Sequence, residues 1–119
     1  MKILVCGSRG YTDNKRVYEV LDTLRLMYPA DLTIISGMAR GPDRYAALYA
    51  AMNNIPLETY LPDWEQHGKR AGIIRNMRML TEGKPQNVIA FWDGVSKGTQ
   101  HMIHAAKRKN ITVTIIGLT

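Results

Sequence analysis

Apolar residues fall into two alternating kinds of segment along this chain of 119 residues. Short continuous apolar runs, such as residues 3–6 (ILVC), are typical of strands that are buried on both faces. Between these runs, apolar residues recur at the three-to-four spacing of amphipathic helices, as in Val17, Leu21 and Leu24. Five strands are therefore expected, over residues 3–6, 32–35, 56–60, 88–92 and 111–116.

Four helices are expected between these strands. Asp13 is a plausible N-cap for the first helix, and Pro29 ends it. Pro42 suits the first turn of an alanine-rich second helix that runs to about residue 53. Residues 62–69 are expected to form a polar loop. The third helix follows, with Ile73, Ile74, Met77 and Leu80 on its apolar side, and Gly83 and Pro85 stop it; the fourth begins near Thr99.

Strands that alternate with helices predict an α/β fold with a parallel sheet and helices on both of its faces. Right-handed crossovers leave few arrangements for five such strands. We expect a single Rossmann-like domain over residues 1–119, doubly wound, with strand order 3-2-1-4-5. Ligands bind such sheets at the carboxyl ends of the strands, near the point where the strand order reverses. Here that point lies between the first and fourth strands.

Three loops at this edge are rich in glycine, over residues 7–10, 36–43 and 93–99. They follow the first, second and fourth strands, which are neighbours in the expected order. Glycine allows close approach of the backbone to a ligand, and helix N-termini offer free N–H groups to phosphate. Each loop alone is equally explained by a tight turn, but their convergence, with Arg9, Arg40 and Lys97 among them, favours a phosphate-bearing ligand. The GxGxxG fingerprint and the P-loop are both absent, so an ordinary dehydrogenase or NTPase is not expected.

The net charge of +6 favours anionic partners, either nucleotides or nucleic acid. The basic cluster at residues 107–109 is equally well explained as the solvated end of a helix. The single cysteine, Cys6, excludes an internal disulfide and suits a reducing compartment, so a cytoplasmic location is expected. No apolar run in the sequence has the length of a membrane span, and no signal peptide is expected.

Four segments together resemble the SLOG superfamily (Smf/DprA and LOG), and most closely its small YspA/YpsA-like members. They are GSRG, SGMARGPDRYA, DWEQHGKRAGIIRNMRML and AFWDGVSKGTQHMI, and they span nearly the whole chain in order. The resemblance implies a Rossmann-like fold and a nucleotide or nucleotide-derived ligand, either ADP-ribose/NAD-like or a nucleoside monophosphate. It also implies a homo-oligomer.

Phosphoribohydrolases of this superfamily have the motif PGGxGTxxE, whose glutamate acts on the ribose. Gly98 and Thr99 match the motif, but the glutamate position holds Met102, which cannot do acid–base work. A sensor or sequestering module that binds without this chemistry is therefore favoured. An enzyme cleaving an N-glycosidic bond is the alternative, and a DNA-binding protein the second alternative. Any catalytic substitute would come from Asp43, Asp63, Glu65 and Asp93.

The predicted ligand and phosphate site lies on the three loops and the third helix. Its residues are Gly7, Ser8, Arg9, Ser36, Gly37, Arg40, Gly41, Asp43, Arg75, Asn76, Gly94, Lys97, Gly98 and Thr99. The resemblance brings in Arg75 and Asn76, for which a solvated surface is the alternative. Trp64 and Trp92 are candidates to stack on a base, or equally to cover the core. His101 and His104 lack a third ligand at suitable spacing, so no metal or other cofactor is expected.

Overall fold

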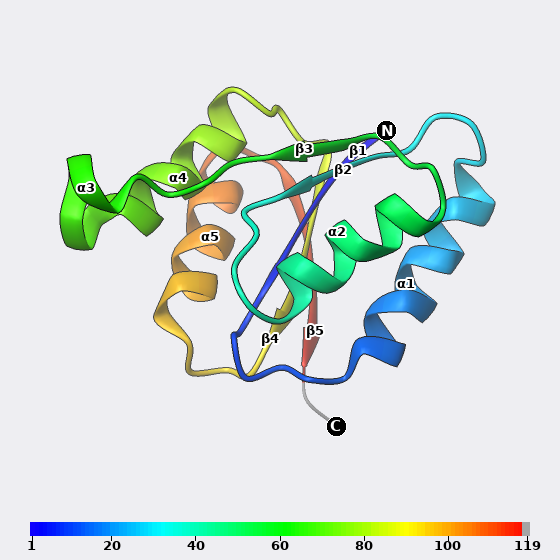
Figure 1. Ribbon diagram of the computed structural model, residues 1–119, viewed down its shortest axis with the longest axis horizontal. Helices are drawn as coiled ribbons and strands as arrows, with labels where there is room; N and C mark the ends of the chain where they lie inside the picture. The colour runs from blue at the N-terminus through cyan, green and yellow to red at the C-terminus, as the bar shows by residue number, and fades with distance from the viewer. Residues whose placement is uncertain (118–119) are drawn as a thin grey trace.

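The computed structural model describes residues 1–117, which form a parallel sheet between two layers of helices (Figure 1). The strands are β1 (Lys2–Gly7), β2 (Thr33–Ser36), β3 (Leu57–Thr59), β4 (Asn87–Trp92) and β5 (Thr112–Gly117). The helices are α1 (Asn14–Met27), α2 (Pro42–Met52), α3 (Trp64–His67), α4 (Ala71–Thr81) and α5 (Lys97–Arg108), with a short 3₁₀ helix, η1 (Gly68–Arg70), between α3 and α4.

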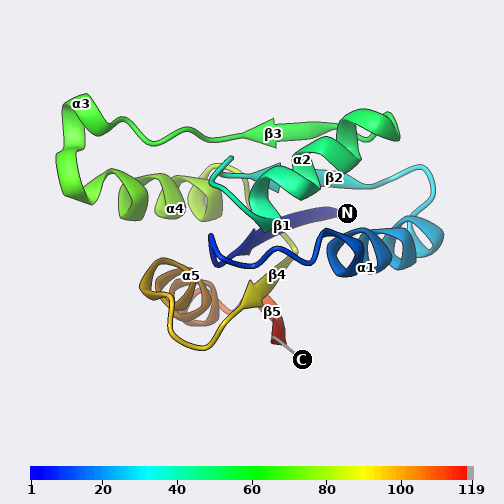
Figure 2. The ribbon, with the colours of Figure 1, turned by 60° about the horizontal axis from the view of Figure 1, so that its bottom comes forward.

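The strand order is β3-β2-β1-β4-β5 and all pairs are parallel, which confirms the expected topology. Helices α1 and α2 lie on one face of the sheet, and α4 and α5 on the other (Figures 1 and 2). The central strands β1 and β4 are buried over most of their length because helices cover both sides. Among residues 1–117, no helix combines the length and apolar content needed to cross a membrane.

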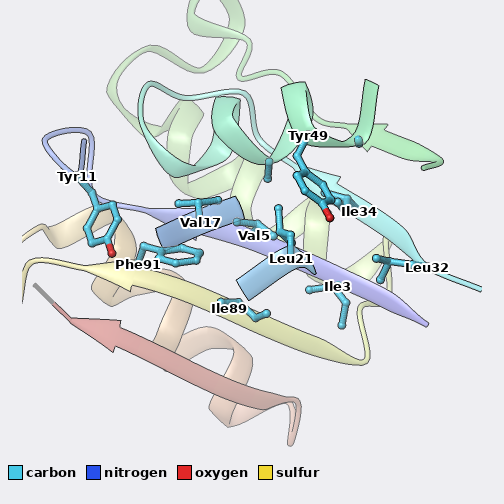
Figure 3. Close-up of a cluster of buried hydrophobic side chains, with 12 residues drawn as sticks. Ile3, Val5, Tyr11, Val17, Leu21, Leu32, Ile34, Tyr49, Ile89 and Phe91 are labelled. Atoms are coloured by element: carbon cyan, nitrogen blue, oxygen red, sulfur yellow. The ribbon is translucent and has the colours of Figure 1, made fainter. Parts of the chain in front are cut away.

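Alternate residues of β1 enter two separate cores. Ile3 and Val5 pack under α1 and α2, whereas Leu4 and Cys6 pack under α4 and α5. Figure 3 shows the first core, in which Leu21 of α1 lies over β1 and β4. Because Leu21 is fully buried there, it holds α1 to the centre of the sheet.

The structure corrects the expectation of a polar loop at residues 62–69. This stretch contains α3, and Asp63 caps it by accepting a hydrogen bond from the Gln66 backbone N–H at 3.1 Å. The helix is only four residues long and has no buried residue, so it left no apolar periodicity to detect. Figure 1 shows α3 beyond the outer end of α4, away from the sheet. Helix α5 begins at Lys97, two residues before the expected start at Thr99. Its first two residues are not apolar, so the apolar periodicity did not reveal them.

The expected apolar side of α4 is correct only for the second half of the helix, where Leu80 is buried and Met77 packs against the second core. Ile73 is 46% exposed, whereas Ala71, Asn76, Met79 and Leu80 are buried. The last turns of α4 pack on β2 and β4 through Met79 and Leu80, in the second core. Its first turns lie past the strand ends, where the helix faces a cleft rather than the sheet. Polar residues can therefore occupy its inner side there.

We expect Leu21→Ala to lower the free energy of unfolding by about 2–5 kcal/mol, because it leaves a cavity between α1 and the sheet. Urea denaturation measures this change. Leu26→Ala is the matched control on the same helix. Leu26 is 84% exposed, so its substitution should change stability by no more than about 0.5 kcal/mol. Equal losses for both variants would contradict the assigned face of α1.

Candidate functional site

A cleft of about 400 Å³ opens at the carboxyl ends of β1 and β4. The loop after β1, the start of α2, the first turns of α4 and the start of α5 surround it. The predicted residues that line it are Gly7, Ser8, Arg9, Asp43, Arg75, Asn76, Lys97, Gly98, Thr99 and Trp64. The cleft therefore lies at the switch point between β1 and β4, where doubly wound sheets bind their ligands.

Ser8 joins two of the surrounding loops. Its backbone N–H donates to the Phe91 carbonyl at 3.0 Å, and its hydroxyl oxygen accepts from the Asp93 N–H at 3.1 Å. Ser8 is buried, so these bonds form away from water. They fix the loop after β1 against the loop after β4, and the position of the cleft wall depends on them.

The glycines of the three loops have two different roles. A methyl group at Gly7 would lie 2.6 Å from the Phe91 carbonyl oxygen and from the Pro42 ring. Gly41 has a φ of +86°, and a methyl group there would lie 2.8 Å from the Ser8 carbonyl oxygen. These two glycines let the loops pack on one another. Gly98, in contrast, faces open space in the cleft, so its missing side chain leaves room for a ligand.

Helix α5 begins in the cleft without a side-chain cap. The Ser96 hydroxyl, which sits at the N-cap, donates to the Asp93 carboxylate at 2.8 Å instead of accepting from the first turn. The N–H groups of the first turn, at Lys97 and Gly98, therefore remain available at the positive end of the helix dipole. This is the electrostatic arrangement that binds phosphate and other anions.

Asp93 lies behind this helix start. Its carboxylate accepts from the Val95 and Ser96 N–H groups at 2.9 and 2.8 Å. These bonds, with the Ser96 hydroxyl, lower the pKa of Asp93 to about 2. Asp93 is thus a negatively charged residue that organises its own loop.

Arg75 is held in a fixed position on the opposite wall. Its Nη1 donates to the Gly37 carbonyl at 2.6 Å and its Nε to Asn76 Oδ1 at 2.9 Å. A methyl group at Gly37 would lie 2.7 Å from Nη1, so glycine is needed there for the arginine to reach the loop. Burial lowers the pKa of Arg75; the Asp43 carboxylate opposes this effect, and the charge of Arg9 adds to it. Two cations are therefore close enough to repel each other across the cleft.

Asp43 is the one acidic residue among the described residues that line the cleft. It is 4% exposed, and burial raises its pKa to about 7 against the opposing effects of Arg75 and the backbone amides of Ala39 and Gly37. Of the four carboxyl groups considered as catalytic substitutes, Asp63 caps α3, Glu65 is exposed on α3, and Asp93 caps its loop. Only Asp43 could act on a ligand in the cleft.

Several predicted residues lie elsewhere. Ser36 is buried; its hydroxyl donates to the Asp43 carbonyl at 2.8 Å and accepts from the Met38 N–H at 3.1 Å. Gly94 is exposed and Gly41 is packed under Ser8, so neither lines the cleft. Gly37 and Arg40 line a neighbouring cavity.

The two tryptophans also differ in position. The Trp92 indole N–H donates to the Ser96 carbonyl at 3.1 Å, and its ring packs on the second core. It does not line the cleft, so the core-covering alternative applies to it. Trp64 lines the cleft and is 52% exposed, which leaves a ring face available for stacking.

The lining also contains residues that the sequence analysis did not select, namely Cys6, Gly10, Ala39, Lys69, Gly72, Ile73, Met79, Ser96 and Met102. Gly10, Ala39 and Ser96 lie within the glycine-rich loops that the sequence singled out, and Lys69 lies in a visibly basic stretch, so these positions carried a signal. Cys6 lies at the base of the cleft, where burial raises the pKa of its thiol well above the ordinary range. Within residues 1–117, no three His, Cys, Asp or Glu side chains gather as a metal site would require.

The fold is similar to that of a solved structure, DNA processing protein A (DprA) from Streptococcus pneumoniae. The TM-score is 0.81 at 20% sequence identity, over 99% of this chain and 50% of DprA. This chain thus corresponds to about half the length of DprA, and the similarity concerns the fold.

A full-length sequence relative is the Gene 61 protein of Mycobacterium phage D29. It is 35% identical over 121 residues, which cover 98% of this chain and 96% of the phage protein. Residues 1–67, from β1 through α3, match the model of the YspA, cpYpsA-related SLOG family. The match includes the glycine-rich loops after β1 and β2. The chain therefore belongs to the YspA, cpYpsA-related SLOG family.

Proposed function

We propose that this protein binds a nucleotide or a nucleotide-derived ligand in the cleft. The observation that carries the proposal is the uncapped start of α5, which faces Arg75 across a cleft at the switch point of the sheet. The ligand's phosphate would lie at the N–H groups of Lys97 and Gly98, with the Thr99 hydroxyl as a further donor. Its base would stack on Trp64.

The charges around the cleft support an anionic ligand. Arg9, Lys69, Arg75 and Lys97 line it, against Asp43 alone on the acidic side. Charge-assisted hydrogen bonds from such groups are about twice as strong as those between neutral groups. The net charge of +6 would add a favourable long-range attraction for the same class of ligand.

A binding role, as a sensor or a sequestering module, is supported by Met102. This residue occupies the position of the superfamily glutamate, and it lines the cleft while being 1% exposed. A thioether has no proton to exchange, so the acid–base step of glycosidic cleavage has no group at this position.

An N-glycosidic hydrolase is the second candidate, and Asp43 is the observation in its favour. A carboxyl group with a pKa of about 7 can give or take a proton at neutral pH.

DNA binding is the remaining alternative, suggested by the basic chain and by the name of DprA. Homo-oligomer formation and a cytoplasmic location stay predictions; light scattering of the purified protein tests the first.

The direct test is to incubate the protein with adenosine, AMP, ADP-ribose and NAD, and to record both the melting temperature and the products by mass spectrometry. We expect phosphate-bearing ligands to raise the melting temperature by several degrees at about 100 times their Kd, and adenosine to raise it little. Released base or ribose phosphate would favour the hydrolase. If DNA alone binds, and its binding depends strongly on salt, the DNA-binding alternative is favoured.

Gly98→Asp should abolish the shift caused by AMP. The new carboxylate enters open space, so the fold tolerates it, and its charge takes the place of the phosphate at the start of α5. Gln100→Asp is the matched control, because it adds the same charge to an exposed position in the same turn, outside the cleft lining. Loss of AMP binding in both variants, or in neither, would contradict the assigned phosphate position.

Asp43→Asn should change how stability depends on pH. Burial raises the pKa of Asp43 from 3.8 to about 7, so between these values the folded protein binds more protons than the unfolded chain. The wild-type free energy of unfolding should therefore fall, by on the order of a few kcal/mol more than that of the variant, as pH rises from about 4 to 7. Urea denaturation of both proteins across this range measures the difference. Parallel curves would show that Asp43 keeps its ordinary pKa.

A further inference from the structure

A second cavity of about 440 Å³ adjoins the cleft on the side of β2 and β3. It lies between the loop after β2 and the segment that leads from β3 into α3. Arg40, Arg44 and Leu61 line it, and it shares Arg9, Arg75 and Trp64 with the cleft. The two cavities are therefore neighbouring parts of one surface, and the shared residues stand at the boundary.

Four arginines line this second cavity, and its described lining contains no acidic residue. Elsewhere in residues 1–117, Arg16 and Arg78 form salt bridges with glutamates one helical turn away. Among the described residues, no carboxylate oxygen lies within 4 Å of Arg9, Arg40, Arg44 or Arg75. Arg25, Arg70 and Arg108 also form no salt bridge there, but they do not line this cavity. Within residues 1–117, the only carboxylate that acts on the four arginines of the cavity is that of Asp43, which lies beyond 4 Å from Arg75 and is itself shifted toward its neutral form by burial.

Two of the four arginines, Arg44 and Arg75, are also held in place by hydrogen bonds. Arg44 Nε donates to the Met38 carbonyl at 3.1 Å, which ties its stem to the loop after β2 and leaves the terminal nitrogens free. Arg75 is bound to Gly37 in the same loop. Burial is the main cause of the lowered pKa of Arg75, and repulsion from the charge of Arg9 adds to it. An anion between them would relieve this repulsion, and a guanidinium held in place loses less entropy when it binds one.

We propose that the second cavity is a second phosphate subsite, so that the ligand is a dinucleotide with phosphate groups on both sides of Trp64. This inference rests on the proposed function, because the first phosphate lies at the start of α5. The base between the phosphates stacks on the exposed indole, and Leu61 offers apolar contact to the sugar. Each cavity lies within the range of about 300–1,000 Å³ that small-molecule sites occupy. A free dinucleotide and the 5′ end of a single strand share this chemistry.

The test compares AMP with the 5′-phosphorylated dinucleotide pApA by isothermal titration calorimetry in about 0.15 M salt, where charges further apart than about 8 Å are largely screened. We expect pApA to bind at least about tenfold more tightly than AMP, since a second charge-assisted contact is gained. Arg44→Glu should remove most of this gain and leave AMP affinity within about twofold. Equal affinities for the two ligands in the wild type, or an equal loss for both in Arg44→Glu, would overturn the proposal.

Arg16→Glu is the matched control, because it makes the same charge change at an exposed position on α1, away from both cavities. It should alter neither affinity by more than about twofold; a loss of pApA binding equal to that of Arg44→Glu would show an effect of net charge alone and overturn the subsite. A 5′-phosphorylated dT12 strand distinguishes a strand end from a free dinucleotide as the ligand. If it binds more tightly than pApA and Arg44→Glu abolishes this binding, the ligand is a strand end. If it binds more weakly than pApA, the ligand is a free dinucleotide.

The failure of the subsite differs from the failure of the proposed function. If AMP binds and pApA binds no better, only the subsite is wrong. If pApA binds through Arg44 but Gly98→Asp has no effect on either ligand, the phosphate position at α5 is wrong and the second cavity alone holds an anion. If neither ligand binds, both proposals fail.

Discussion

The close packing of three loops at one edge of the sheet is the constraint on which the site depends. Gly41 lies against the Ser8 carbonyl, Gly7 lies against Pro42 and the Phe91 carbonyl, and Ser8 accepts a hydrogen bond from the loop after β4. The parallel order β2-β1-β4 brings these loops together, and small residues allow them to touch. The cleft wall is thus closely packed and hydrogen-bonded, and such a wall can hold charges in defined positions.

The charges that this wall holds are unbalanced. Arg75 reaches the Gly37 carbonyl because no side chain stands in its way, and Arg9 lies near enough to disfavour its protonation. The α5 dipole adds further positive potential, since Asp93 and Ser96 bond to each other rather than to the first turn. Asp43 offsets little of this charge, because its own burial favours the neutral form. An arrangement of this kind is costly without an anion, which is the physical reason to expect one.

The sequence predicted the fold well because strand order follows from general rules. Continuous apolar strands that alternate with helices allow few parallel sheets, and the convergence of the glycine loops follows from the order. Apolar periodicity could not show that α4 extends past the strand ends. It therefore did not predict that Arg75 faces the cleft or that Ile73 is exposed. Periodicity also could not show which tryptophan lines the cleft, because Trp92 ends β4 and Trp64 follows β3. The sequence also could not distinguish the roles of the glycines. Gly7 allows two loops to pack together, whereas Gly98 leaves open space in the cleft, and only the structure shows this difference.

The chemistry of the cleft floor argues for binding over catalysis. Cys6, Met79 and Met102 form an apolar floor, in which burial disfavours the charged form of the thiol and the methionines exchange no proton. Among the acidic residues that the structure describes, only Asp43 lines the cleft, and burial raises its pKa to about 7 against the opposing effects of Arg75 and backbone amides of the loop after β2. That loop also carries Gly37, the partner of Arg75. The loop after β2 thus holds Arg75 in place through a backbone carbonyl, and a guanidinium fixed in this way can bind a phosphate without any proton transfer.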